Sequence, residues 1–361
     1  MSSSISNLLT RILHDVFGEN DPARRRAAID GIFTEDCVFC EPRGVHRGCD
    51  EIERVAGAIK ATHPRPMHHS PQKRYMVIAS LAISLGTSSG VAWAQPQGQT
   101  LTTSDTLGAT ARQAMIDIFR KKDAEAIDRY FGTSFIQHDP TLADGLAGMK
   151  SFAAEVASSA TADITIYRTL VDGNFVLLHS RYEGAGRYGG PAIAFDLFRF
   201  DGGKIVEHWG GQEPEAPPNL SGRTQVDGPT VVLDREKTEI NRTLVRTYRQ
   251  TVMVDLRFDR IEEFIEGSHY AQHASKIGDG IARLRDRIAS VAKEGGQLYL
   301  TPRRFVADGN FVLVLTEGDL PAGHTALYDL FRVADGKIVE HWDVLAPIPP
   351  RDQWKNGNGP F

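Results

Sequence analysis

The chain has 361 residues, of which 41% are hydrophobic and 24% are charged, and its formal net charge is −5. This length predicts two or three domains of ordinary size. Sequence-independent binding of nucleic acid needs clustered Lys and Arg, and no long basic run occurs here, so we expect no nucleic-acid partner.

Residues 1–66 contain all three cysteines, Cys37, Cys40 and Cys49. Cys37 and Cys40 have the spacing of a zinc knuckle, but a zinc site needs about four ligands, and His46 and Cys49 are the only further candidates nearby. We therefore interpret Cys37–Cys40 as an alternating strand. Apolar patterns predict three helices, over 8–16, 24–32 and 50–60, with no hairpins after them. This arrangement indicates a truncated front half of a domain.

Residues 67–104 are typical of a secretory signal peptide followed by a linker. Lys73-Arg74 precede an apolar run over 76–85, and Ala92-Trp93-Ala94 has the small residues of a cleavage site. We expect a periplasmic or secreted protein if translation starts near Met67. The alternative is a buried helix or a single anchor, which makes the protein cytoplasmic or membrane-anchored if residues 75–94 stay uncleaved.

An internal repeat is the strongest feature of the chain. The segment from Phe195 to Trp209 recurs at 328–342 with most residues unchanged, including Gly-Lys-Ile-Val-Glu-His-Trp. Two further blocks recur upstream in the same order: Asp172-Gly173-Asn174 as Asp308-Gly309-Asn310, and Gln137-His138 as Gln272-His273. Three blocks in one order at nearly constant spacing indicate duplication of a whole domain.

Each copy reads as helices followed by hairpins. Helical patterns cover 109–120, 124–130 and 146–157 in the first copy, and 238–254, 261–266 and 281–293 in the second, with a Gln-His turn before the third helix. Short runs rich in β-branched residues follow, joined by Asp-Gly turns. We predict an α+β fold class. The predicted organisation is a first domain at 105–215, a linker at 216–233, a second domain at 234–350 and a tail at 351–361.

The Phe33–Gly48 block and the paired Asp-Leu-Phe-Arg and Gly-Lys-Ile-Val-Glu-His-Trp blocks resemble the SnoaL-like branch of the nuclear transport factor 2-like superfamily, and the group predicted to catalyse aldol condensation in particular. The resemblance implies tandem cone-shaped domains, each with three helices packed on a curved, mostly antiparallel sheet around an apolar pocket. It also implies chemistry without a cofactor, in which a carboxylate takes a proton next to a carbonyl and a histidine or other donor polarises the oxygen.

Enolisation needs a base near the α-carbon and a donor near the oxyanion. In the second copy, His341 and Asp343 lie on one face of the last strand, and we group them with Asp329 and His273 as the candidate site. The first copy has Gly210 in place of Asp343. Its candidates are Asp196, His208, His138 and His179. Which copy is active stays open at this point.

Structural roles compete with these assignments. The Glu-His-Trp strand is also consistent with a packed tryptophan and a buried, satisfied histidine. Asp196 and Asp329 are equally consistent with ion pairs to Arg199 and Arg332. No recurrent metal-ligand spacing occurs, so we expect no metal site.

Two functions therefore follow from the sequence. One is a cofactor-free lyase or isomerase for a small apolar or carbonyl-containing ligand. The other is a non-catalytic module that binds a ligand or mediates dimerisation. The two copies are expected to pair either within one chain or as a homodimer.

Overall fold

The computed structural model describes residues 11–33, 37–41, 44–62, 103–184, 188, 190–267, 269–286, 299–320 and 323–361. The chain divides into two compact units, Met1–Gly98 and Gln99–Phe361. The predicted signal-like segment lies outside the described residues up to position 102. Among the helices that are described, none is both long and apolar enough to cross a membrane.

The first unit is a small helical cluster with one hairpin. Its elements are η1 (Ile12–Phe17), α2 (Pro22–Ile32), β1 (Val38–Glu41), β2 (Gly44–Arg47) and α3 (Cys49–Thr62). Asp21 caps α2 by accepting backbone N–H groups at 2.8 and 3.2 Å, next to Pro22 at the first helical position. The predicted strand is confirmed by β1, and the side chains of Cys37 and Cys49 are buried.

The second unit contains two sheets with the same strand order. We call α4 to β7 the first half and η3 to β12 the second half. The first half consists of α4 (Thr103–Phe119), α5 (Ala126–Tyr130), β3 (Phe131–Gln137), α6 (Gly145–Ser158), β4 (Asp163–Asp172), β5 (Phe175–Glu183), β6 (Ala192–Asp201) and β7 (Lys204–Pro214). Its sheet has the order β3-β7-β6-β5-β4, antiparallel except where β3 joins β7.

The second half repeats this plan with less regular helices. Its elements are η3 (Arg235–Lys237), α7 (Thr238–Tyr248), η4 (Arg249–Val254), η5 (Phe258–Glu263), β8 (Ala271–Gln272), β9 (Tyr299–Asp308), β10 (Phe311–Leu320), β11 (Gly323–Ala334) and β12 (Lys337–Pro347), followed by η6 (Arg351–Gln353). The strand order is β8-β12-β11-β10-β9. The α+β prediction is confirmed, and Gly173 and Gly309 take the positive φ of the predicted hairpin turns (59° and 57°).

The predicted Gln-His turn is wrong in one respect. Gln137 ends strand β3 and Gln272 ends strand β8, and each pairs in parallel with the last strand of its sheet. Strand β8 shows no alternation between buried and exposed side chains, because Gln272 and both of its neighbours are buried.

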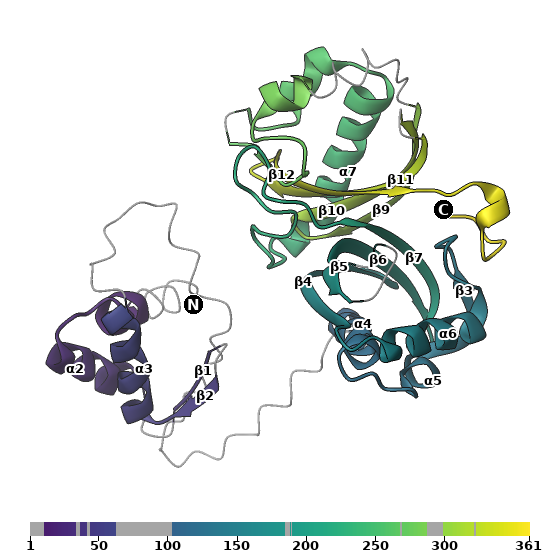
Figure 1. Cartoon of the computed structure of the whole chain (residues 1–361). Coiled ribbons are helices and arrows are strands. Elements are labelled where there is room, and N and C mark those ends of the chain that lie inside the picture. Colours follow the sequence, from purple (N-terminus) through teal and green to yellow (C-terminus); the bar gives the residue numbers. More distant parts are fainter. Residues whose placement is uncertain are drawn as a thin grey trace. The chain divides into compact units, whose positions relative to one another are not determined.

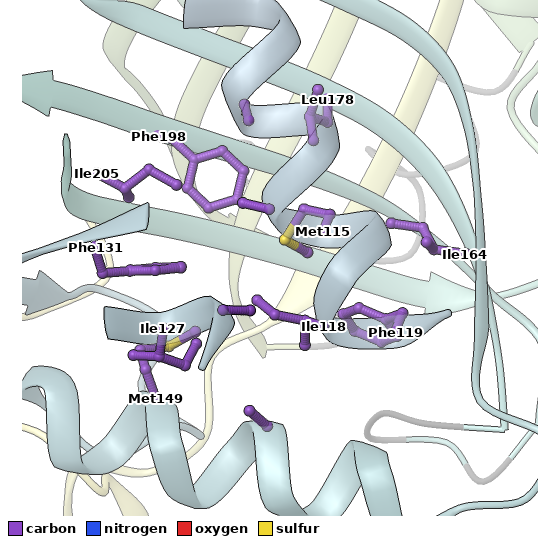
Figure 2. Close-up of a cluster of buried hydrophobic side chains, with 14 of the residues drawn as sticks. Met115, Ile118, Phe119, Ile127, Phe131, Met149, Ile164, Leu178, Phe198 and Ile205 are labelled. Atoms are coloured by element: carbon purple, nitrogen blue, oxygen red, sulfur yellow. The ribbon is translucent and has the colours of Figure 1, made fainter. Parts of the chain in front are cut away.

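Side chains along each strand point alternately to the two faces of its sheet, and both faces are apolar. In β5, Leu178 faces the helices of the first half, and Leu177 faces the other sheet. Figure 1 shows the helices on the outer side of each sheet and the two sheets against one another. Figure 2 shows how Met115, Phe119 and Met149 fill the space between the helices and the first sheet, together with further apolar side chains.

The contacts between the two sheets are reciprocal. Arg304 of the second half lies 4.5 Å from the ring centre of Trp209, and Arg168 of the first half lies 4.1 Å from that of Trp342. The aspartates of the two hairpin turns also bind the backbone of the opposite half. Asp308 accepts the N–H of Val171 at 2.9 Å, and Asp172 accepts the N–H of Ala307 at 3.1 Å. The two halves therefore pack around an approximate two-fold axis.

The segment after each last strand also crosses to the opposite half. After β7, Asn219 donates to the carbonyls of Gln272, Ala274 and Ile277 at 2.6, 3.3 and 2.8 Å. After β12, Asn356 donates to the carbonyls of Asp139 and Leu142 at 2.7 and 3.0 Å. In each half, the loop that follows the parallel strand is thus held by hydrogen bonds from the other half.

Candidate active site

Each half contains the same pair of polar side chains on the helix-facing side of its sheet. Nε2 of His208 lies 3.0 Å from Oδ1 of Asp196, and Nε2 of His341 lies 3.0 Å from Oδ1 of Asp329. In the second half the register pairs Asp329 with Asp343 and Phe331 with His341, so Asp329 and His341 are diagonal neighbours on one face. The hairpin geometry therefore creates both pairs.

A glutamine fixes the imidazole of each pair. Oε1 of Gln137 accepts the backbone N–H of Asp139 at 2.8 Å, and Oε1 of Gln272 accepts that of Ala274 at 2.9 Å, which identifies these atoms as carbonyl oxygens. The same oxygens lie 3.0 and 2.9 Å from Nδ1 of His208 and His341. Nδ1 must therefore donate.

The remaining proton of each pair lies between the imidazole and the carboxyl group. Because Nδ1 already carries a proton, the hydrogen bond at Nε2 requires either an imidazolium beside a carboxylate or a neutral imidazole beside a carboxylic acid. The third partner of the aspartate differs between the halves.

In the first half the third partner is Tyr182. Its hydroxyl donates to Oδ2 of Asp196 at 2.6 Å, and burial together with this carboxylate raises the pKa of Tyr182 well above its ordinary value. Both oxygens of Asp196 are therefore occupied. A Cβ added to Gly210 would lie 2.8 Å from Cε1 of His208, so the strand brings no further side chain to the pair.

In the second half the third partner is Arg249, a buried residue of η4. Its Nη2 lies 2.8 Å from Oδ2 of Asp329 and also donates to Thr316 at 3.1 Å. Burial opposes ionisation of Asp329, but Arg249 and His341 together hold its pKa below the ordinary value. Asp329 is therefore a carboxylate. Among the described residues, the buried Oδ2 of Asp329 faces the guanidinium of Arg249.

Asp343 adds a second carboxyl group to this site. One oxygen or nitrogen atom from each of Asp329, His341 and Asp343 lies within 4.8 Å of the other two. Burial, followed by the charges of Glu213 and Asp329, raises the pKa of Asp343 well above its ordinary value. Two neighbouring aspartates thus have pKa values shifted in opposite directions, which is the pattern of an acid and a base in one site.

These three side chains also have the donor types of a metal site, but Arg249 already supplies a positive charge at Oδ2 of Asp329. A metal ion would have to compete with this guanidinium, whereas proton transfer uses the site as it stands. The ion pairs considered for Asp196 and Asp329 do not form, since Arg199 pairs with Glu207 and Arg332 with Glu340, on the opposite faces of these strands.

Three predicted histidines lie away from these pairs. His138 stacks on Trp209 at 4.5 Å, and His273 stacks on Trp342 at 4.6 Å, on the side of each sheet that faces the other half. His273 bonds to the carbonyl of Thr224 at 2.8 Å and to Glu340 at 2.9 Å. Grouping His273 with Asp329 is therefore not supported, because adjacent residues at the end of β8 face opposite sides.

His179 lies in the interface between the sheets. Arg168 donates to its Nδ1 at 3.0 Å, and its ring stacks on Phe195 at 4.3 Å. Burial and the Arg168 charge lower the pKa of His179 well below its ordinary value, so the ring is neutral. It is part of a packed interface and does not join Asp196.

The sequence contained a signal for Gln137 and Gln272, because each occurs in the repeated Gln-His block. We assigned the function to the histidine of that block, whereas the glutamine contacts the site. Tyr182 and Arg249 belong to no repeated block, and only the fold reveals them.

The comparisons with known proteins match part of the chain. Residues 113–208 match the sequence model of the SnoaL-like domain. No curated protein matches the chain. Among solved structures, TsrD from Streptomyces laurentii is 18% identical over 29% of this chain and 89% of that one, with a TM-score of 0.27.

Two further solved structures are similar to parts of this chain. An NTF2-like protein of unknown function from Mesorhizobium loti is 19% identical over 30% of this chain and 93% of that one, with a TM-score of 0.27. A steroid delta-isomerase from Pseudomonas aeruginosa is 21% identical over 32% and 85%, with a TM-score of 0.26. Residues 113–208 of this chain are therefore similar to the SnoaL-like domain family.

Proposed function

We propose that the second half is a cofactor-free lyase or isomerase site that moves a proton next to the carbonyl of a small, largely apolar compound. The observation that supports this most directly is the pair of neighbouring carboxyl groups, Asp329 and Asp343, whose pKa values are shifted in opposite directions. A SnoaL-like domain in the same chain supports a pocket protein of this general kind.

In the proposed step, the Asp329 carboxylate removes a proton from the carbon next to the carbonyl. Asp343, protonated at rest, donates its proton to the carbonyl oxygen. The C–H bond and the O–H bond of Asp343 break, and new O–H bonds form on Asp329 and on the carbonyl oxygen. This gives an enol and transfers the negative charge from Asp329 to Asp343. His341 and Gln272 hold Asp329 in place. The enol then accepts its proton at another carbon or attacks a second carbonyl, as in an aldol closure.

We propose a different role for the first half, as a non-catalytic binding or pairing module. Its aspartate has both oxygens occupied, by Tyr182 and His208, and Gly210 offers no second carboxyl group. One face of its sheet is covered by the second half. We also propose that the two halves descend from one duplicated domain, because they share strand order and reciprocal contacts.

Exchange of α-protons for deuterium tests this proposal without knowledge of the natural substrate. Small ketones such as acetone and cyclohexanone would be incubated with the full chain in heavy water and followed by NMR. We expect Asp343→Asn and Asp329→Asn to lose about 100-fold or more of the catalysed exchange. The matched first-half variant Asp196→Asn should retain it. Unchanged exchange in both second-half variants would exclude the assignment, and circular dichroism would show that each variant is folded.

A further inference from the structure

Glu213 belongs to the first half but reaches the second. It lies near the end of β7, and its Oε2 accepts the backbone N–H of Leu345 at 3.1 Å. Its Oε1 accepts a hydrogen bond from Gln225. β8 pairs with β12 only at Glu340 and His341, so the edge of β12 beyond these residues is open to the Glu213 carboxyl group. Leu345 is two residues from Asp343 on that strand.

Glu213 has no carboxyl counterpart at the position that the approximate two-fold axis relates to it. In the first half, Gly210 pairs with Asp196 as Asp343 pairs with Asp329. Three residues further along each last strand stand Glu213 in the first half and Ala346 in the second. Gly210 and Ala346 line a crevice between the halves. The second-half site therefore has two carboxyl groups, Asp343 and Glu213, at places where the first-half site has Gly210 and Ala346.

We propose that Glu213 is a positioning residue of the second-half site, supplied by the first half, which keeps the proton on Asp343. This inference rests on the proposed function, in which Asp343 donates that proton. It also explains why the two halves remain in one chain, because the second half alone lacks one group of its own site.

Like charges explain the effect. Two neighbouring carboxyl groups that are largely removed from water do not both ionise readily, so a proton is retained. After burial, Glu213 contributes most to the raised pKa of Asp343, and the pKa of Glu213 itself is raised by its own burial. Among the described residues, the other titratable or charged groups that act on this pair are Asp329 of β11, His341 of β12, Arg249 of η4, Tyr270 before β8 and Lys276 after it.

The test is a titration of Asp343 in the full chain, with and without Glu213→Gln. Aspartates labelled with ¹³C at the carboxyl carbon would be followed by NMR across pH, and Asp343→Asn would identify the signal. We expect Glu213→Gln to lower the pKa of Asp343 by about one unit or more. Glu215→Gln is the matched control. Glu215 lies two residues after Glu213 and pairs with Arg181, so this variant should leave the titration of Asp343 unchanged.

The pH profile of α-proton exchange gives a second readout. If Asp343 is the acid, Glu213→Gln should move the alkaline limb of the profile to lower pH by the same shift, while circular dichroism shows a folded protein. An Asp343 titration that is identical with and without Glu213 would overturn the inference. A shifted titration in a chain that exchanges no α-protons would keep the link between Glu213 and Asp343 and would overturn the proposed function instead.

Discussion

The two halves of the second unit share an aspartate, a histidine and a glutamine in the same geometry, and they differ in what faces the aspartate. In the first half the hydroxyl of Tyr182 donates to Asp196. In the second half the guanidinium of Arg249 and the carboxyl group of Asp343 face Asp329. The Asp-His-Gln chain is therefore a property of the scaffold. The residues that surround these three side chains distinguish a purely structural group in the first half from the proposed acid-base site in the second.

The largest expected difference between the halves concerns the partner of the buried aspartate. Arg249→Met leaves Asp329 buried without its cation, and removal of one member of a buried ion pair typically costs about 3–5 kcal/mol. We expect a loss of stability of this size, measured by chemical denaturation of the full chain.

Tyr182→Phe is the matched change in the first half. It removes one neutral donor from Asp196, which should cost about 1–3 kcal/mol. An Arg249→Met loss no greater than that of Tyr182→Phe would mean that the ion pair does not distinguish the two halves.

The contact between the halves is tested at Gly211. A Cβ at this position would lie 2.4 Å from Cε2 of Tyr328, a residue buried between the two sheets. We expect Gly211→Ala to cost about 1–3 kcal/mol, because overpacking forces a shift in the sheet or the ring. Thermal denaturation would measure it. Gly357→Ala is the control, since a Cβ there meets nothing within 4 Å, and equal effects of the two variants would contradict the packing.

The crossing segments provide a smaller comparison. Asn219 is buried and donates to three carbonyls of the second half, whereas Asn356 donates to two carbonyls of the first half and is partly exposed. We expect Asn219→Ala to cost about 1–2 kcal/mol and Asn356→Ala about half of that, because water replaces the lost donor more readily at a partly exposed site.

Hydrogen exchange would locate these two effects. Asn219→Ala should loosen the amides of residues 272–277, and Asn356→Ala those of residues 137–142. If either variant loosened the loop of the wrong half, the crossing segments would not act as the hydrogen bonds indicate.

Much of this fold could be predicted from the sequence, because its signals are local. The hairpins followed from Asp-Gly-Asn turns between β-branched runs, and the pairing of Asp329 with His341 and Asp343 followed from alternation along neighbouring strands. These features depend on spacing within about fifteen residues, which a sequence shows directly.

The remaining features depend on contacts between distant segments. Arg249 reaches Asp329 from a helical turn eighty residues earlier, and Glu213 reaches β12 from the other half of the unit. The orientation of Gln272 and His273 depends on a two-residue parallel strand that has no pattern of its own. The side chains that distinguish the two halves are therefore those that tertiary packing places, and one sequence does not reveal them.

The smallest expected effect concerns the pH dependence of stability at Asp343. Its pKa is raised in the folded state, so between the ordinary carboxyl pKa and the raised one the folded state holds more protons than the unfolded state, and stability falls as pH rises. Asp343→Asn removes this term. Because the new amide still buries polar atoms, we expect a net gain of only about 0.5–1 kcal/mol at neutral pH, and none at pH below about 4. Denaturation of wild type and variant across pH would measure the difference, with exposed Asp352→Asn as the control. A difference that is the same at acid and neutral pH would show that Asp343 ionises like an ordinary carboxyl group, and the second half would then lose the acid that separates it from the first.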